Sequence, residues 1–308
     1  MTGRDRPLTG TRIGIFGKGG SGKSTVTVLA ARALQMKGYQ VVVLDADSTN
    51  LGMPGALGLE RVPDPLIDYF GGLVFSGGRV TCPVDDPTLL SEGVLDLGEI
   101  PDRYRAVSPE GIAYLEGGKM GHLGAGAGCD GPIAKIARDL QVRTAEDPQP
   151  VMLIDFKAGM EDSIRGVLTG LDWGLLVVDP SITSVRLAAE MKQMAVDIQS
   201  GARPATAHLE DPNLVEMAES LFRGARIRGL SVVLNRVGDE QTDTFLREAL
   251  EEDDIRPSGS IGDHPEIARS WLRGEELRSP EALEEASEVM DTVETEVFTV
   301  LQPSTRGG

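Results

Sequence analysis

A short stretch near the start of the chain has the residue types and spacing of a phosphate-binding loop. Residues 17–24 read Gly-Lys-Gly-Gly-Ser-Gly-Lys-Ser. The glycines let successive backbone N–H groups converge on a phosphate, because no side chain blocks the approach. In such a loop Lys23 reaches the β- and γ-phosphates, the Ser24 hydroxyl completes a magnesium shell, and the helix that begins here adds its partial positive charge. The predicted nucleotide contacts are Gly17, Lys18, Gly19, Gly20, Ser21, Gly22, Lys23, Ser24 and Thr25.

Acidic residues close two apolar segments further along the chain. The apolar run at 41–44 is followed by Asp45, Ala46 and Asp47, and the run that starts at Val151 ends in Asp155. Carboxylates at the carboxyl ends of parallel strands lie at the crevice where ligands bind. We therefore predict a magnesium site formed by Ser24, Asp45 and Asp155, in which Asp155 holds the ion through a water molecule.

These residues need elements that hold them together, and the chain alternates apolar strands with helices. The strands are not amphipathic, and continuous apolar strands separated by helices are typical of a parallel sheet covered on both faces. The predicted fold is therefore a doubly wound α/β domain with a mostly parallel sheet and helices on both faces. A helix is expected at 23–36, and core strands at 11–16, 41–44, 151–156, 173–178 and 230–234.

Two stretches interrupt this alternation. Residues 71–131 are rich in Gly, Pro and Asp and contain a short strand-like piece at 111–115. Residues 200–228 separate a helix from its expected strand. We interpret both as insertions in a single domain that spans residues 1–308, with an acidic helix at 281–300. The 308 residues contain no internal repeat and no low-complexity linker that would favour two domains.

Composition narrows the class of partner. The formal net charge is −18, from 48 acidic and 30 basic residues, so the overall field repels phosphate backbones and anionic lipid. No apolar run approaches the roughly 20 residues that span a bilayer, and the N-terminus lacks the apolar stretch of a signal peptide. Two cysteines suit a reducing compartment. We expect a cytoplasmic protein that binds no nucleic acid and has no stable membrane insertion.

Lys18, directly after the first glycine, makes the loop resemble that of a particular superfamily. The sequence Gly-Lys-Gly-Gly-Ser-Gly-Lys-Ser-Thr is similar to the deviant Walker A loop of the signature-lysine P-loop ATPases, which include septum-site, partitioning and metal-centre maturation ATPases. The resemblance implies ATP and Mg²⁺ as cofactors and a homodimer that forms on ATP. It also implies that Lys18 crosses the interface to the partner's nucleotide, where a second cation neutralises charge in phosphoryl transfer.

The same resemblance assigns further roles. Asp45 and Asp47 resemble the first switch of this superfamily, in which Asp47 corresponds to the residue that orients the attacking water. The predicted catalytic residues are therefore Lys18, Lys23 and Asp47. Gly159 resembles the second-switch glycine whose N–H binds the γ-phosphate. Asn235 matches a position that binds the adenine edge, although an Asx-turn residue at a strand end is the alternative. Lys157 has no role that the sequence assigns.

Three stretches most resemble the accessory ATPase that loads nickel into carbon monoxide dehydrogenase. They are residues 117–119 leading to 128–129, residues 155–161 and residues 178–181. The resemblance implies a maturation factor that acts on a client metalloenzyme. A partitioning or septum-positioning ATPase is the alternative, but it needs DNA or membrane attachment, and the acidic C-terminal helix has no basic amphipathic face.

The accessory family binds metal through a Cys-x-Cys pair at the dimer interface, and this sequence departs from that pattern. It reads Cys129-Asp130-Gly131, so each subunit offers one thiolate there. Two such thiolates across a dimer, completed by Asp130 or His122, would form an interfacial nickel or zinc site. The alternative is that Cys129 is a free, partly buried cysteine without a ligand role.

Overall fold

The computed structural model describes residues 6–120, 129–145 and 148–301. Its main sheet has eight strands, which are parallel except for the antiparallel pair β4–β5. In order across the sheet, the strands are β10 (Gly259–Gly262), β9 (Gly229–Val237), β8 (Trp173–Val178), β1 (Arg12–Gly17), β7 (Val151–Asp155), β2 (Val41–Asp45), β5 (Ala113–Glu116) and β4 (Ala106–Val107). A separate two-stranded parallel sheet pairs β3 (Val94–Asp96) with β6 (Gln141–Arg143).

Alternate residues of the central strands enter two different hydrophobic cores. In β2, Val41 and Val43 pack in one core, and Val42 and Leu44 pack in the other. Both faces of the strand are therefore removed from water, which explains why it reads as a continuous apolar run. The predicted doubly wound sheet with helices on both faces is confirmed.

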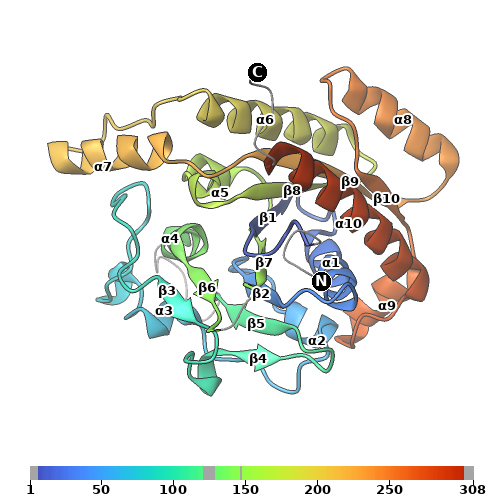
Figure 1. The fold of residues 1–308 in the computed structure, drawn as a ribbon, viewed down its shortest axis with the longest axis horizontal. Coiled ribbons are helices and arrows are strands. Elements are labelled where there is room, and N and C mark those ends of the chain that lie inside the picture. The colour runs from blue at the N-terminus through green and yellow to red at the C-terminus, as the bar shows by residue number, and fades with distance from the viewer. Residues whose placement is uncertain (1–5, 121–128, 146–147, 302–308) are drawn as a thin grey trace, which may run out of the picture.

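The helices divide between these two faces (Figure 1). One face carries α1 (Lys23–Met36), α9 (Pro265–Arg273) and α10 (Pro280–Leu301), and the other carries α4 (Gly131–Asp139), α6 (Ile182–Gln199) and α8 (Glu240–Glu251). The remaining helices are α2 (Met53–Ala56), α3 (Leu66–Tyr69), α5 (Glu161–Ile164) and α7 (Pro212–Arg223), with short 3₁₀ turns η2 (Val74–Ser76), η3 (Asp102–Tyr104) and η4 (Val167–Gly170).

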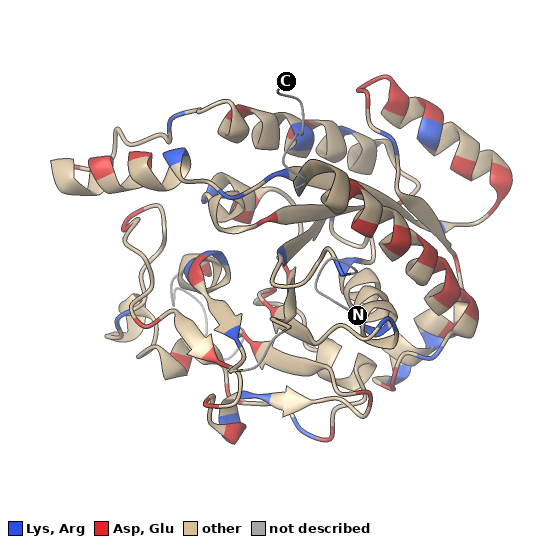
Figure 2. Ribbon diagram, viewed as in Figure 1, with Lys and Arg blue, Asp and Glu red and all other residues tan. Residues whose placement is uncertain are grey.

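The acidic helix expected at 281–300 exists and extends from Pro280 to Leu301 as α10. Its acidic residues are visible along the helix in Figure 2. Ala286, Val289 and Val293 are buried, and they lie in the same core as residues of α1. The helix thus buries an apolar face over the sheet while its carboxylates stay near water.

The stretch 71–131 differs from a peripheral insertion, because part of it belongs to the main sheet. Strand β5 lies beside β2, and Leu115 pairs with Leu44 in parallel register. The strand-like piece expected at 111–115 overlaps β5, although β4 and β5 are only two and four residues long. Strands this short carry little periodicity.

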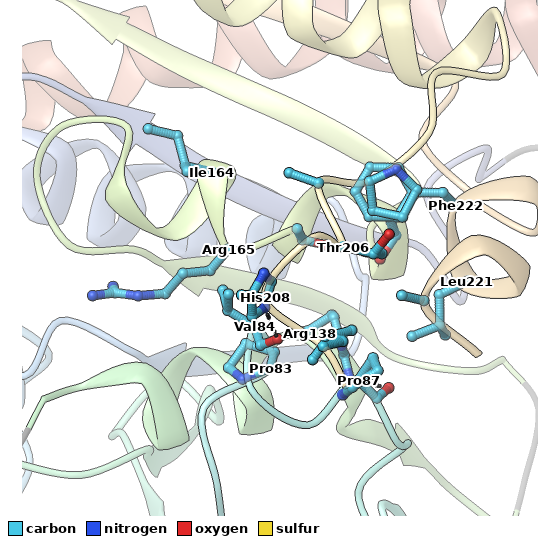
Figure 3. A pocket seen from close by; sticks show the side chains of 16 residues that line it. Pro83, Val84, Pro87, Arg138, Ile164, Arg165, Thr206, His208, Leu221 and Phe222 are labelled. Atoms are coloured by element: carbon cyan, nitrogen blue, oxygen red, sulfur yellow. Dashed lines mark hydrogen bonds between the residues drawn. The ribbon is translucent and has the colours of Figure 1, made fainter. Parts of the chain in front are cut away.

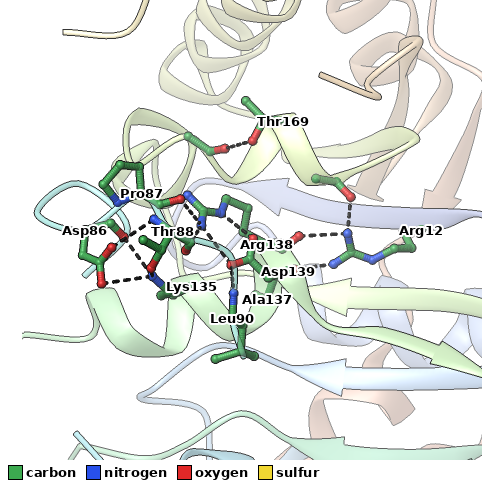
Figure 4. Close-up of polar contacts among 12 residues, drawn as sticks. Arg12, Asp86, Pro87, Thr88, Leu90, Lys135, Ala137, Arg138, Asp139 and Thr169 are labelled. Atoms are coloured by element: carbon green, nitrogen blue, oxygen red, sulfur yellow. Dashed lines mark hydrogen bonds and ion pairs between the residues drawn. The ribbon is translucent and has the colours of Figure 1, made fainter. Parts of the chain in front are cut away.

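A buried polar network holds this segment against α4 (Figure 4). Arg138, which is 4% exposed, forms an ion pair with Asp139 at 2.6 Å and donates to the carbonyl oxygens of Pro87 and Thr88. Arg12 of β1 donates to the Arg138 carbonyl oxygen at 2.9 Å. Buried cations persist only when they are paired in this way. The network therefore fixes the C-terminal end of α4 relative to β1.

Within residues 6–120, 129–145 and 148–301, the structure contains no helix of the length and apolarity needed to cross a membrane.

Candidate nucleotide-binding site

The loop between β1 and α1 has a shape that only glycine permits at Gly22. Gly22 has a φ of +91°, and a Cβ added there would lie 2.2 Å from Nδ2 of Asn235. A side chain would therefore clash with Asn235 and strain the backbone. Gly17 is similarly confined, because an added Cβ would lie 2.6 Å from the carbonyl oxygen of Val177. These close approaches form a backbone cradle at the carboxyl end of β1.

Backbone donors in this cradle are free to bind an anion. Among the described residues, the N–H groups of Gly20, Gly22 and Lys23 have no protein acceptor. The side chain of Lys23 likewise has no carboxylate within ion-pair distance in the described part of the chain, although the residue is only 6% exposed. A buried ammonium group beside unpaired N–H groups at a helix N-terminus is the arrangement that binds phosphate.

Ser24 and Asp155, two of the predicted magnesium-site residues, are in direct contact. The Ser24 hydroxyl donates to Oδ2 of Asp155 at 2.6 Å, and Asn50 donates to the same hydroxyl at 2.9 Å. Burial raises the pKa of Asp155 to about 7, the charge of Asp45 adds to this effect, and Lys23 opposes it. The hydroxyl and carboxylate oxygens are hard ligands of the kind that Mg²⁺ prefers.

Asp45 lies beside Asp155, because these two residues are register partners in β2 and β7. Its carboxylate is bonded within the chain, to Nζ of Lys119 at 2.8 Å and to the hydroxyl of Tyr114 at 3.1 Å. Burial raises the pKa of Asp45 to about 6, although the charge of Lys119 opposes the shift. Lys119 and Tyr114 were not predicted as site residues, because no sequence spacing connects them to Asp45.

Asp47 is buried and its carboxylate is held by its own loop. Oδ1 of Asp47 accepts hydrogen bonds from the backbone and the hydroxyl of Thr49, at 2.9 and 2.6 Å. Its carbonyl oxygen accepts a bond from Lys119 at 2.7 Å. Lys119 thus joins both predicted first-switch aspartates, through the side chain of Asp45 and the backbone of Asp47.

Two residues predicted to contact nucleotide have partners within the chain. Nζ of Lys18 lies 2.9 Å from Oδ2 of Asp179, and the Lys18 side chain is 30% exposed. The backbone N–H of Gly159 donates to the carbonyl oxygen of Gly17 at 3.0 Å. The first contact joins the loop to the segment after β8, and the second joins it to the segment after β7.

Asn235 is buried and its side chain supports the loop. Nδ2 donates to the carbonyl oxygen of Ser21 at 2.7 Å. Thr25 accepts a hydrogen bond from the indole of Trp271 at 2.8 Å, which connects α1 to α9. The adenine contact of Asn235 stays a prediction, and it would use the carbonyl end of the side-chain amide.

Cys129 is half-buried and lies just before α4, directly after a stretch outside the described residues, and His122 falls in that stretch. The other thiol, Cys82, is buried against the start of α4, because a Cβ added at Gly131 would lie 2.5 Å from its Sγ. Burial raises the pKa of Cys82. Among the described residues, no group of three or more His, Cys, Asp or Glu side chains is arranged to hold a metal.

A mostly apolar pocket lies next to α5 (Figure 3). Its wall includes Pro83, Val84, Ile164, Leu221 and Phe222. None of its lining residues belongs to the loop at 17–25 or to the acidic strand ends. The nucleotide cradle and this pocket are therefore different places on the molecule.

The raised pKa of Asp155 predicts a pH-dependent stability for the protein without nucleotide or Mg²⁺. The native state holds a proton that the unfolded chain releases near pH 4, so this group stabilises the fold most at low pH. Its contribution declines as pH rises toward 7. In Asp155→Asn, the fall in unfolding free energy between pH 4 and 7 should be shallower, by up to about 1.4 kcal/mol per pH unit.

Urea denaturation at several pH values measures this slope. Asp253→Asn changes an exposed aspartate after α8 and serves as the matched control, with the wild-type slope expected. A wild-type slope in Asp155→Asn would contradict the assignment of the buried proton to Asp155.

Comparison with known proteins places this site in a family. The model of the CobQ/CobB/MinD/ParA nucleotide binding domain matches residues 15–277. An uncharacterized ATP-binding protein of Methanocaldococcus jannaschii is 29% identical over 284 residues, covering 92% of this chain and 98% of that protein. The carbon monoxide dehydrogenase accessory protein CooC of Rhodospirillum rubrum is 32% identical over 189 residues, covering 61% of this chain and 70% of that protein.

A solved structure shares the fold. The septum site-determining protein MinD from Pyrococcus horikoshii, complexed with Mg-ADP, aligns with a TM-score of 0.59 at 15% identity, covering 95% of this chain and 99% of that one. The family match includes the phosphate loop and both acidic strand ends described above. The chain therefore belongs to the CobQ/CobB/MinD/ParA family of P-loop nucleotide-binding proteins.

Proposed function

We propose that this protein binds ATP with Mg²⁺ and hydrolyses it to ADP and phosphate. The observation that carries the proposal is the largely buried side chain of Lys23, which has no carboxylate partner among the described residues, beside N–H groups of the loop that have no acceptor there. Ser24 and Asp155 would hold the magnesium ion, with Asp45 next to them. The ion would neutralise phosphate charge when it is bound. ATP is the proposed nucleotide because the full-length relative is described as ATP-binding.

The remaining residues take roles around the γ-phosphate. Asp47 orients the attacking water, and Lys23 and Lys18 stabilise the charge that develops in the transition state. Gly159 donates its N–H to the γ-phosphate after it leaves the carbonyl oxygen of Gly17. Asn235 holds the loop and accepts a bond from the adenine amino group.

Two substitutions separate binding from chemistry. Lys23→Ala should abolish ATP binding, because it removes the main cation at the phosphates. Asp47→Ala should keep ATP affinity within about threefold and lower turnover at least 100-fold, because water orientation is lost while the phosphate contacts remain. Titration with a fluorescent ATP analogue and phosphate-release assays measure the two effects. Turnover of Asp47→Ala at the wild-type rate would contradict its role.

We also propose that ATP drives a homodimer in which Lys18 reaches the partner's nucleotide. To do so, Lys18 must leave Asp179, so the ion pair at 2.9 Å opposes dimerisation. In an Asp47→Ala background with ATP, light scattering should show a doubled mass. Lys18→Ala should lose it, and Asp179→Asn should show it at lower protein concentration.

Lys192→Ala is the control for this experiment, because it removes another ion-paired lysine, which bonds Asp254 after α8. It should dimerise like the parent protein. A mass independent of nucleotide in every variant would count against the proposed dimer.

The proposed biological role is maturation of a metalloenzyme, of the carbon monoxide dehydrogenase accessory type. The similarity to CooC supports this role. The alternative, a partitioning or septum-positioning ATPase, has support at the level of the fold, since the MinD structure is only 15% identical. The net charge of −18 argues against attachment to nucleic acid or anionic lipid. We therefore favour a cytoplasmic role on a client protein.

A maturation role raises the question of a transition metal at Cys129. If two Cys129 thiolates meet across the dimer, uptake of nickel or zinc should reach half a metal per subunit, increase with ATP and weaken as pH falls. Equilibrium dialysis of wild type and Cys129→Ser tests this. Cys82→Ser is the matched control, because its thiol is buried, and it should keep the uptake. Equal uptake by wild type and Cys129→Ser would remove Cys129 from the site.

A further inference from the structure

One carboxylate joins the segment after β2 to the segment after β7. Oδ2 of Asp130 accepts a hydrogen bond from the hydroxyl of Ser48 at 3.1 Å and lies 2.8 Å from Nζ of Lys157. Oδ1 of Asp130 lies 3.1 Å from Nη2 of Arg165. Ser48 adjoins Asp47, and Lys157 is two residues before Gly159. Asp130 therefore contacts the residue next to Asp47 in the first switch and a residue near the start of the second switch.

The Asp130 carboxylate is largely enclosed and negatively charged. Its side chain is 11% exposed, and those of Lys157 and Arg165 are 31% and 18% exposed. Burial opposes its ionisation, but the hydrogen bond from Lys157 and the charge of Arg165 outweigh it and lower the pKa of Asp130. Two cations and a hydroxyl on one semi-buried carboxylate form a contact stronger than an exposed ion pair.

Further contacts hold the segment after β2 and the helix that follows Asp130. Lys119 bonds the side chain of Asp45 and the carbonyl oxygen of Asp47. Helix α4, which begins directly after Asp130, is held at its C-terminal end by the buried network around Arg138 (Figure 4). Arg165, which pairs with Asp130, also contacts Asp162 at 2.8 Å and lines the apolar pocket beside α5 (Figure 3). Asp130 is thus anchored to the body of the protein and bonded to both switches.

We propose that Asp130 is a positioning residue for hydrolysis, which sets the first and second switches relative to each other through Ser48, Lys157 and Arg165. In this arrangement Asp47 reaches the attacking water while the N–H of Gly159 reaches the γ-phosphate. The inference rests on the proposed ATPase function. It predicts a loss of turnover without a loss of nucleotide affinity, because Asp130 contacts neither the phosphate loop nor Ser24.

Asp130→Asn tests this, because it keeps the shape and removes the charge. We expect kcat to fall about tenfold while KM for ATP stays within about twofold. The matched control is Asp243→Asn. Asp243 on α8 also accepts bonds from an arginine and a serine, Arg247 and Ser260, and neither of these bonds involves the loop at 17–25. The control should keep the wild-type kcat even if both variants lose similar thermal stability.

A double-mutant cycle tests whether the effect acts through the contact between Asp130 and Lys157. Lys157→Gln should also lower kcat, and Asp130→Asn/Lys157→Gln should be no slower than the slower single variant, because both changes break the same link. Multiplying effects would overturn the proposal. If Asp130→Asn fails to fold, Ser48→Ala removes one neutral bond from the same carboxylate, with an expected fall in kcat of about threefold.

The outcomes distinguish the two claims. Normal turnover in the wild type together with a wild-type kcat in Asp130→Asn overturns the positioning role and leaves the ATPase function standing. A rise in KM equal to the fall in kcat also overturns it, because that pattern indicates damage to binding. Absence of ATP turnover in the wild type, with nucleotide bound, overturns the proposed hydrolysis itself and the positioning role with it.

Discussion

The structure depends on a concentration of buried charge at the carboxyl edge of its central strands. β1, β2 and β7 lie side by side, so the ends of all three deliver functional groups to one place. They bring the ammonium group of Lys23 and the carboxylates of Asp45 and Asp155, all at most 6% exposed. Charges buried at this depth are costly unless they are paired. The protein meets this cost only partly by itself, and a nucleotide with its magnesium ion would complete the pairing.

The chain itself supplies partners for some of these buried charges but not for all of them. Lys119 and Tyr114 bond the carboxylate of Asp45, and the hydroxyls of Ser24 and Thr27 donate to the two carboxylate oxygens of Asp155. Lys23 has no equivalent partner among the described residues. Burial still raises the pKa of Asp155 to about 7, and the charge of Asp45 adds to this effect. Elements that carry such groups must be held by the rest of the fold, which the two hydrophobic cores on opposite faces of the sheet provide.

Several groups around the loop are bonded to the protein where a nucleotide-dependent role would need them free. Lys18 pairs with Asp179, and the N–H of Gly159 donates to Gly17. Under the proposed function, ATP must exchange these internal bonds for bonds to phosphate and to a second subunit. A ligand shifts such an equilibrium only by its differential affinity for the two arrangements. The internal contacts therefore set how strongly ATP would couple to dimerisation.

Much of the site is readable from the sequence, because its chemistry is local. The glycine pattern at 17–24 and the acids that end apolar runs are features of consecutive residues, and so are the boundaries of α1 and β8, which match the prediction. The sequence does not reveal Lys119 as the partner of Asp45, Asp179 as the partner of Lys18, or Asp130 as the partner of Lys157. These pairs are 74, 161 and 27 residues apart, and side chains at such separations meet only through packing. The sequence likewise shows a strand-like piece at 111–115, but its place beside β2 as strand β5 is decided by packing. Local spacing determines which groups can do chemistry, and the tertiary structure decides which of them are paired, because burial and charge act through space and not along the chain.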